Sequence, residues 1–344
     1  MKSIPELKCL FLEISRDCPL NCRMCLIGHY KDKRKSKLTE DEYINIITRF
    51  SNMRHDEFPG LVAFCGGEVL KEYDLVINLS KKCRELGLIC ALTTNGYYIK
   101  SHHYEELLTN GPTNIQFSID SLDPEIHDNI RKFKGHWEMQ INHLKNILKK
   151  KRELEVKHGK KVDCLIGPSI IIAKWNYDKI MEMFSFFMEE LGCENISFQP
   201  LMIQVDTVSE MNDFYSENLE IDMKILKINV EELRNSKYFN KYPTVDENSL
   251  NYLLKYFSEN RRNDSTVCDS FDRNMIIDLE GNLALCFPFQ RRMGKFLGVY
   301  PAQKISELWY SEEVQKIRKI LENCNWDCGY MSCHRKLFIK EGKQ

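Results

Sequence analysis

The chain has 344 residues, 43% of them hydrophobic and 29% charged, enough for one large core with or without a small satellite module. Its formal net charge of -1 comes from interspersed acidic and basic residues, so the sequence lacks the basic surface that nucleic acid or an anionic membrane attracts. It also lacks a secretory signal and any window approaching the roughly 20 apolar residues of a membrane span, so we expect a cytoplasmic protein. Because that compartment keeps thiols reduced, clustered cysteines among the 14 indicate metal and scattered ones indicate core.

Apolar runs rich in β-branched and aromatic residues alternate with segments of helical period, which is typical of βα units around a parallel sheet. The expected strands are Cys9–Ser15, Gly60–Cys65, Leu88–Thr93, Asn114–Ile119, Asp163–Ile172 and Asn195–Pro200. The expected helices are Glu40–Phe50, Tyr73–Leu86, His102–Thr109, His136–Glu155, Tyr177–Glu190 and Asn218–Arg234. Six such units predict an α/β fold, a partial (β/α)6 TIM-type barrel whose strands end on one rim, where loops carry the chemistry.

Beyond about residue 235 the pattern breaks into shorter pieces. Met275–Leu279 and Leu283–Phe287 flank the turn-forming sequence Glu280-Gly281-Asn282, which predicts a β-hairpin. We therefore predict two domains, a barrel over residues 1–235 and a small hairpin-plus-helix module over residues 236–344.

Cys18, Cys22 and Cys25 follow the first expected strand directly and so lie in a loop at the barrel rim. An irregular loop lets three thiolates at this spacing each turn to a different iron of a cubane cluster. A closed structural site uses four ligands, whereas three leave one iron open for a substrate or cofactor. A zinc knuckle with a distant fourth ligand and a coincidental run of buried thiols remain alternatives.

This CxxxCxxC motif after the first strand resembles the signature of the radical S-adenosylmethionine superfamily. The resemblance implies a [4Fe–4S] cluster on the three cysteines, with its open iron chelated by the amino and carboxylate groups of S-adenosylmethionine. It further implies one-electron reduction, by a partner such as flavodoxin or ferredoxin, and cleavage of a C–S bond. The 5′-deoxyadenosyl radical then abstracts hydrogen, and the protein positions the reactants.

The ends of the next three strands carry motifs that resemble the family's cofactor site. Residues 66–68 resemble its GGE motif, which binds the methionine amino group, although Val69 stands where proline often follows. Thr-Asn-Gly closes the third strand, and the fourth ends in two polar residues that share one face by the two-residue period. The resemblance implies cofactor contacts from Gly66, Gly67, Glu68, Thr94, Asn95, Ser118 and Asp120. Each motif is also typical of a turn or of a helix cap, which is the alternative interpretation.

Other polar residues and thiols near these motifs receive simpler interpretations. Cys65 stands next to the predicted radical site and is a candidate hydrogen-atom donor, with a small buried side chain as the alternative. His127 and Arg131 are four residues apart on one helix face, where we expect a solvated or capping role. The isolated cysteines are expected in the core, namely Cys9, Cys83, Cys90, Cys164 and Cys193.

A second group of cysteines lies in the C-terminal module. Cys268 and Cys286 are separated by twelve residues, Gly281 and four more, which resembles the start of the SPASM and twitch extensions of radical enzymes. The resemblance implies one auxiliary [4Fe–4S] cluster, with candidate ligands Cys268, Cys286, Cys324, Cys328 and Cys333. Leu337 occupies the position of a further cysteine, so two complete auxiliary clusters are not expected. Zinc is an alternative, because a closed four-thiolate site suits either metal.

The family resemblance implies several substrate classes for the abstraction reaction. Relatives with such extensions oxidise, epimerise or cross-link ribosomal peptides, or oxidise sugars and aminocyclitols. We favour a peptide, although the chain starts at the first barrel strand and leaves no room for an N-terminal leader-binding domain. A hypothesis of another class is a non-catalytic iron–sulfur carrier or zinc-stabilised module, which the open three-cysteine site and GGE motif disfavour.

Overall fold

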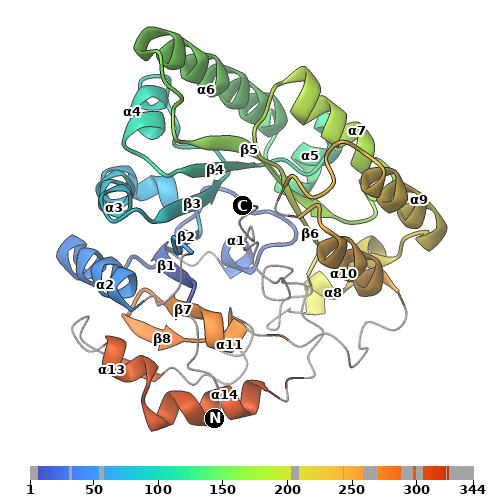
Figure 1. The fold of residues 1–344 in the computed structure, drawn as a ribbon. Helices are drawn as coiled ribbons and strands as arrows, with labels where there is room; N and C mark the ends of the chain where they lie inside the picture. The colour runs from blue at the N-terminus through green and yellow to red at the C-terminus, as the bar shows by residue number, and fades with distance from the viewer. Residues whose placement is uncertain are drawn as a thin grey trace, which may run out of the picture.

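Nine strands form one continuous, strongly curved sheet in the computed structural model of the chain (Figure 1). The structure describes residues 7–30, 33–53, 58–202, 209–242, 244–258, 268, 270–287, 297–299, 305–322 and 324. Its parallel barrel strands are β1 (Cys9–Ser15), β2 (Leu61–Gly66), β3 (Ile89–Thr94), β4 (Asn114–Ser118), β5 (Leu165–Ile172) and β6 (Ser197–Pro200). These strands neighbour each other in sequence order, as successive right-handed βα units require.

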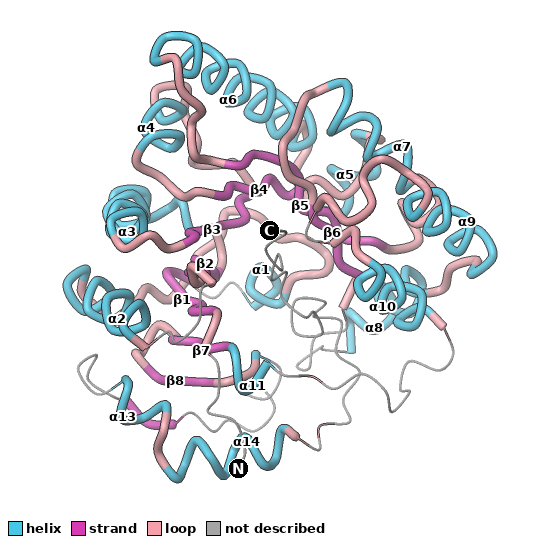
Figure 2. Tube along the Cα trace, in the orientation of Figure 1, coloured by secondary structure: helices cyan, strands magenta, loops and turns pink. Residues whose placement is uncertain are grey.

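Helices cover the outer, convex face of this sheet, and the strands form its inner wall (Figure 2). The outer layer contains α2 (Glu40–Asn52), α3 (Tyr73–Glu85), α4 (His103–Thr109), α6 (His136–His158), α7 (Ile180–Phe184), α9 (Met223–Arg234) and α10 (Glu247–Phe257). The barrel also contains α1 (Leu26–Tyr30) inside the curve, α5 (Pro124–Arg131) and α8 (Ser209–Leu219). The prediction of a partial α/β barrel is confirmed.

Most predicted elements agree with the structure to within two or three residues, and β1 agrees at both ends. The clearest difference concerns the helix predicted over 218–234, which begins later, at Met223, as α9, while an unpredicted helix, α8, precedes it. Asp222 explains the later start, because its side chain accepts a hydrogen bond from the backbone N–H of Lys224 and so begins α9. Another difference is that the second half of the helix predicted over 177–190 is a π-helix, Ser185–Glu190.

The predicted C-terminal hairpin is confirmed as β7 (Asn274–Ile277) and β8 (Asn282–Ala284). In its turn, Asp278 accepts hydrogen bonds from the backbone N–H groups of Glu280 and Asn282. The hairpin does not stand apart from the barrel, since β7 pairs in parallel with β1, with Cys9 opposite Asn274. β9 (Leu297–Val299) then pairs with β8, so the C-terminal strands extend the barrel sheet at its first edge.

Two further helices follow the strands, α13 (Ile305–Trp309) and α14 (Glu312–Leu321). α13 packs against α2 of the barrel as well as against α14, with the Trp309 side chain fully buried. Ser311 begins α14 by accepting a hydrogen bond from the N–H of Val314. Among the helices of the described ranges, none has the length and apolar character needed to cross a membrane.

Candidate functional site

The three cysteines predicted to bind a cluster lie in the loop that leaves β1, inside the curve of the sheet. Cys22 is buried, with 8% of its surface exposed, while Cys18 and Cys25 are partly buried, and none of the three forms a disulfide. The backbone N–H of Cys25 donates to the carbonyl of Cys22 at 3.1 Å, which closes a tight turn between them. The loop therefore presents its three thiols at the predicted rim of the barrel.

Glycines at the end of β2 allow the backbone to pass directly over the start of this loop. A Cβ atom on Gly66 would lie 2.0 Å from the carbonyl oxygen of Ser15, and the φ of Gly66 is +137°. A Cβ on Gly67 would lie 2.6 Å from the carbonyl oxygen of Asp17. The backbone N–H of Gly67 donates to the Ser15 carbonyl at 2.6 Å, so the two loops are joined by main-chain contact. That Gly66 and Gly67 contact a cofactor remains a prediction.

Glu68 is the buried centre of a network that joins the ends of β2 and β3. It is 1% exposed and accepts hydrogen bonds from the Thr94 hydroxyl at 2.8 Å and the backbone N–H of Asn95 at 2.6 Å. The backbone N–H of Leu70 donates a third bond at 3.1 Å. Burial raises the pKa of the Glu68 carboxyl, and the three donors oppose this shift by favouring the carboxylate. Its predicted contact with the methionine amino group remains untested.

Asn95 links the end of β3 to the cysteine loop. Its side-chain Nδ2 donates to the sulfur of Cys18 across 3.4 Å, and its Oδ1 accepts from the backbone N–H of Tyr97 at 3.0 Å. The Thr94 hydroxyl accepts a hydrogen bond from the N–H of Gly96 at 2.9 Å while it donates to Glu68. Two residues predicted to contact the cofactor thus orient the loops that hold the cysteines.

Asp120, just beyond β4, is fully buried and has polar partners on both carboxylate oxygens. Oδ2 accepts from Arg131 Nε at 2.7 Å and forms an ion pair with Nη2 at 2.5 Å, and Oδ1 accepts from the backbone N–H of Ile171 at 3.0 Å. Ser118, the other predicted cofactor contact on this strand, is 8% exposed at the end of β4. The structure brings both residues to the rim, where their roles toward the cofactor remain predictions.

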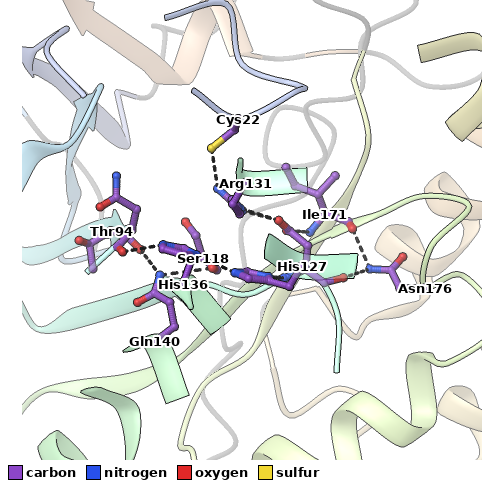
Figure 3. Close-up of polar contacts among 11 residues, drawn as sticks. Cys22, Thr94, Ser118, His127, Arg131, His136, Gln140, Ile171 and Asn176 are labelled. Atoms are coloured by element: carbon purple, nitrogen blue, oxygen red, sulfur yellow. Dashed lines mark hydrogen bonds and ion pairs between the residues drawn. The ribbon is translucent and has the colours of Figure 1, made fainter. Parts of the chain in front are cut away.

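Arg131 occupies a different position from the one expected from the sequence. The solvated or capping role expected for His127 and Arg131 is wrong, because His127 is fully buried and Arg131 only 9% exposed. The shared helix face is confirmed, since both lie on α5. Arg131 spans from Asp120 to the cysteine loop, where its Nη1 lies 3.9 Å from the sulfur of Cys22 (Figure 3). The sequence shows the four-residue spacing of these two residues, but it does not show that their side chains point into the barrel.

Two buried histidines connect α5 to the end of β3 (Figure 3). The backbone N–H of Asp120 donates to His127 Nδ1 at 3.2 Å, so the proton of this neutral imidazole lies on Nε2. His127 Nε2 then donates to His136 Nδ1 at 2.7 Å, which leaves His136 Nε2 to donate to the Asn95 carbonyl at 3.0 Å. Burial and the charge of Arg131 lower the pKa of His127 to about 2 and of His136 to about 4. Both rings are therefore neutral near pH 7.

Acidification is expected to destabilise the fold through these two histidines. The unfolded imidazole has a pKa of about 6.5, so below that pH the unfolded chain binds protons that the folded chain excludes. The contribution of the two histidines to the free energy of unfolding is complete above the pKa of the unfolded imidazole. It falls as the pH drops toward the pKa values of the folded state. At about pH 5 the loss reaches roughly 4 kcal/mol for the pair. Urea unfolding near neutral pH and at about pH 5 measures it.

A matched pair of variants separates this effect from general acid sensitivity. His136→Gln should flatten the dependence of the unfolding free energy on pH, because it removes one imidazole whose pKa is lowered in the folded state. His158→Gln changes an exposed histidine at the end of α6 and should leave the dependence as it is. An unchanged slope in His136→Gln would contradict the assignment.

Two amides strengthen the same rim without having been identified from the sequence. Gln140 Nε2 donates to the carbonyls of Thr94 and Ser118, at 3.4 and 3.3 Å, and so joins the ends of β3 and β4. Asn176 Nδ2 donates to the carbonyls of Asp120 and Ile171, both at 2.8 Å, and joins β4 to β5. Neither belongs to a recognisable motif, so only the folded arrangement shows their function.

The remaining cysteines divide into core residues and untested candidates. The isolated ones, predicted in the core, are all buried, namely Cys9, Cys83, Cys90, Cys164 and Cys193. Cys65 is partly buried and its sulfur lies 3.4 Å from the carbonyl oxygen of Leu12, so its role as a hydrogen donor stays a prediction. Cys268 and Cys286 are partly buried and Cys324 is exposed. Cys328 and Cys333 lie outside the described residues, so the auxiliary ligand set is untested.

The loop cysteines suit a cubane better than a single metal ion. Within the described residues, no three His, Cys, Asp or Glu side chains converge closely enough to hold one metal ion, as a mononuclear zinc site would require. A cubane instead takes each thiolate on a different iron. Burial, with smaller contributions from the neighbouring Cys22, Glu68 and Cys25, raises the pKa of Cys18 to about 12, so thiolates here need a cationic partner. A [4Fe–4S] cluster held by these residues would supply that partner.

Two relatives of known description resemble the chain in sequence. The "Tungsten-containing aldehyde ferredoxin oxidoreductase cofactor-modifying protein" of Pyrococcus furiosus is 23% identical over 92% of this chain and 85% of its own length. A PqqA peptide cyclase of Bradyrhizobium diazoefficiens is 25% identical over 43% of this chain and 36% of its own length.

Solved structures show the same fold. Streptococcus suis SuiB, solved with S-adenosylmethionine and with its precursor peptide SuiA, has a TM-score of 0.67 to this chain in both structures. The identity is 19%, and the alignments cover 95% of this chain and 74% and 73% of SuiB. Residues 12–159, which contain the cysteine loop and the rim of β1 to β4, match the model of the Radical SAM superfamily. Residues 12–159, with the cysteine loop and the parallel strands around it, are therefore similar to the radical SAM superfamily.

Proposed function

We propose that this chain reductively cleaves S-adenosylmethionine and uses the resulting radical to abstract hydrogen from a substrate carbon. The observation that carries the proposal is the cysteine loop itself, three thiols at the rim of a parallel barrel within the matched segment. Three thiolates leave one iron of a [4Fe–4S] cluster open for a cofactor. The proposed ligands are Cys18, Cys22 and Cys25.

The residues of the rim have distinct parts in this proposal. When bound, the cluster and S-adenosylmethionine supply the electron and the 5′-deoxyadenosyl radical. Gly66 and Gly67 allow close backbone approach beside the cysteine loop, and Glu68 with Thr94 holds that approach in place. Ser118 ends β4 on the same rim, so its hydroxyl is a proposed cofactor contact.

We propose a peptide as the substrate. The PqqA peptide cyclase and the complex of SuiB with its precursor peptide support this class. A second candidate is a cofactor, because the relative aligned with nearly the whole chain is named a cofactor-modifying protein. A sugar or aminocyclitol is a further alternative. A mass change in short peptides encoded beside the gene, after incubation with reduced enzyme, would favour the first class over the others.

An auxiliary cluster in the module of residues 236–344 is proposed to accept an electron or arrange the substrate. The segment that follows β8 supports this, because the Phe287 ring packs edge-on against Phe11 of β1, with ring centroids 5.3 Å apart, and Cys286 precedes Phe287 directly. Its proposed ligands come from Cys268, Cys286, Cys324, Cys328 and Cys333. A flavodoxin or ferredoxin is the proposed reductant.

Replacing Cys268 and Cys286 with alanine tests both parts of this function. The double variant should still form 5′-deoxyadenosine and methionine from S-adenosylmethionine, because the loop of Cys18 is unchanged. Conversion of the substrate should fall to background. Chromatography of the cofactor products and iron analysis of anaerobically reconstituted protein give the measurements.

Two outcomes would contradict this division of roles. S-adenosylhomocysteine as the product of the unchanged enzyme would indicate methyl transfer instead of hydrogen abstraction. Loss of 5′-deoxyadenosine from a soluble double variant with an intact barrel would mean that the C-terminal module supports the first site directly.

A further inference from the structure

Two side-chain N–H donors contact two of the three loop thiols. Asn95 Nδ2 lies 3.4 Å from the sulfur of Cys18, and Arg131 Nη1 lies 3.9 Å from the sulfur of Cys22. The donors come from different elements, the end of β3 and the end of α5, so the two contacts arise independently. Hydrogen bonds to cluster sulfurs are among the factors that set the reduction potential of an iron–sulfur cluster.

We propose that Asn95 and Arg131 raise the reduction potential of the cluster held by the cysteine loop, and that the His127–His136 pair keeps Asn95 in place. The proposal deepens the proposed function and rests on the cluster assigned there. Reduction adds negative charge, which spreads onto the thiolate sulfurs. A donor aimed at a sulfur favours the electron-rich state, so losing it makes reduction harder.

Arg131 is fixed against rotation away from the sulfur. Its Nε and Nη2 both contact Asp120 Oδ2, which leaves Nη1 directed toward Cys22. Asp120 is itself held by the backbone N–H of Ile171 at 3.0 Å (Figure 3). Because the guanidinium is planar, two bonds on one side determine where the third nitrogen points. Arg131 is thus a positioning residue whose own anchor is a buried carboxylate.

The histidine pair contacts Asn95, the second donor to the cysteine loop. The chain of donors runs from the backbone N–H of Asp120 through His127 and His136 to the carbonyl oxygen of Asn95. The backbone N–H of Asn95 also donates a hydrogen bond to Glu68. The backbone of Asn95 is thus held through its N–H and its carbonyl, and its side chain is held by the bonds to Cys18 and to the N–H of Tyr97. Asp120 therefore anchors both donors.

Redox titration of the reconstituted full chain, followed by electron paramagnetic resonance, tests the proposal. The signal that changes when S-adenosylmethionine is added belongs to the open-iron cluster and is the one to titrate. Asn95→Ala removes one donor, and Arg131→Lys keeps the charge beside Asp120 but cannot contact Asp120 and Cys22 together. Each variant should make the midpoint potential more negative by about 59 mV, which corresponds to about a tenfold change in the equilibrium of a one-electron step.

Arg84→Lys provides a matched control. Arg84 is also partly buried and donates to backbone carbonyls, those of Gly111, Pro112 and Asp163. These residues precede β4 and β5, at the opposite ends of the strands from the cysteine loop. Its replacement should leave the potential unchanged, and an equal shift in Arg84→Lys would overturn the proposal.

A double-mutant cycle tests the part assigned to the histidines. His136→Gln should lower the potential in the otherwise unchanged chain but have no further effect in the Asn95→Ala background. Additive shifts would show that His136 acts independently of Asn95 and would overturn that part.

Unchanged potentials in both Asn95→Ala and Arg131→Lys, at full iron content, would overturn the whole proposal. If Arg131→Lys does not fold, Asn95→Ala alone decides, and absence of any signal that responds to S-adenosylmethionine would refute the proposed function instead.

Discussion

Replacing Cys18, Cys22 and Cys25 together with alanine is expected to abolish formation of 5′-deoxyadenosine from S-adenosylmethionine. Without its three thiolates the loop cannot hold a cluster, and no electron reaches the cofactor. The reconstituted variant should lose the iron and sulfide of one cluster and retain the rest on the C-terminal module. Iron and sulfide analysis, with chromatography of the cofactor products, measures both effects.

A control removes the same number of thiols from the core. Cys83, Cys164 and Cys193 are buried away from the cysteine loop, so their replacement by alanine should cost some stability and leave the iron content unchanged. Cofactor cleavage should persist in this control. If the loop variant kept all its iron, or if the unchanged protein held only zinc, the assignment of the radical site would be wrong.

Gly66→Ala is expected to be the most damaging single substitution near the site. The added Cβ would lie 2.0 Å from the Ser15 carbonyl oxygen, and the φ of +137° is strained for any residue with a side chain. Together the clash and the strained backbone should cost about 2–5 kcal/mol. Because β2 meets the cysteine loop here, the variant should also bind less iron. Urea unfolding and iron analysis measure the two effects.

Gly87→Ala is the matched control for this substitution. Gly87 also has a positive φ, +65°, but no atom lies within 4 Å of the position that its Cβ would take. It should cost only the roughly 1–2 kcal/mol of a left-handed backbone and leave the iron content as it is. Equal losses of stability and iron in the two variants would show that the contact with Ser15 does not organise the loop.

Local patterns in the sequence were sufficient for the parallel strands and for the cysteine loop. β1 was predicted at both ends because its apolar run is bounded by Lys8 and by the polar start of the loop. The spacing of Cys18, Cys22 and Cys25 is a local property of one loop, so its chemistry could be inferred before any fold was known. The same holds for Gly66 and Gly67, whose lack of a side chain already indicated close backbone approach.

Contacts between distant segments were decided only by the tertiary structure. Arg131 and Cys22 are 109 residues apart, and they meet because α5 follows a strand whose end shares the rim with β1. The pairing of β7 with β1 is another case, since an apolar run predicts a strand but not which edge it will join. The sequence alone determined the residue types at the rim, because strand period and cysteine spacing are local. The folded sheet decided that Arg131 and Asn95 face the thiols, because their direction depends on long-range strand order and burial.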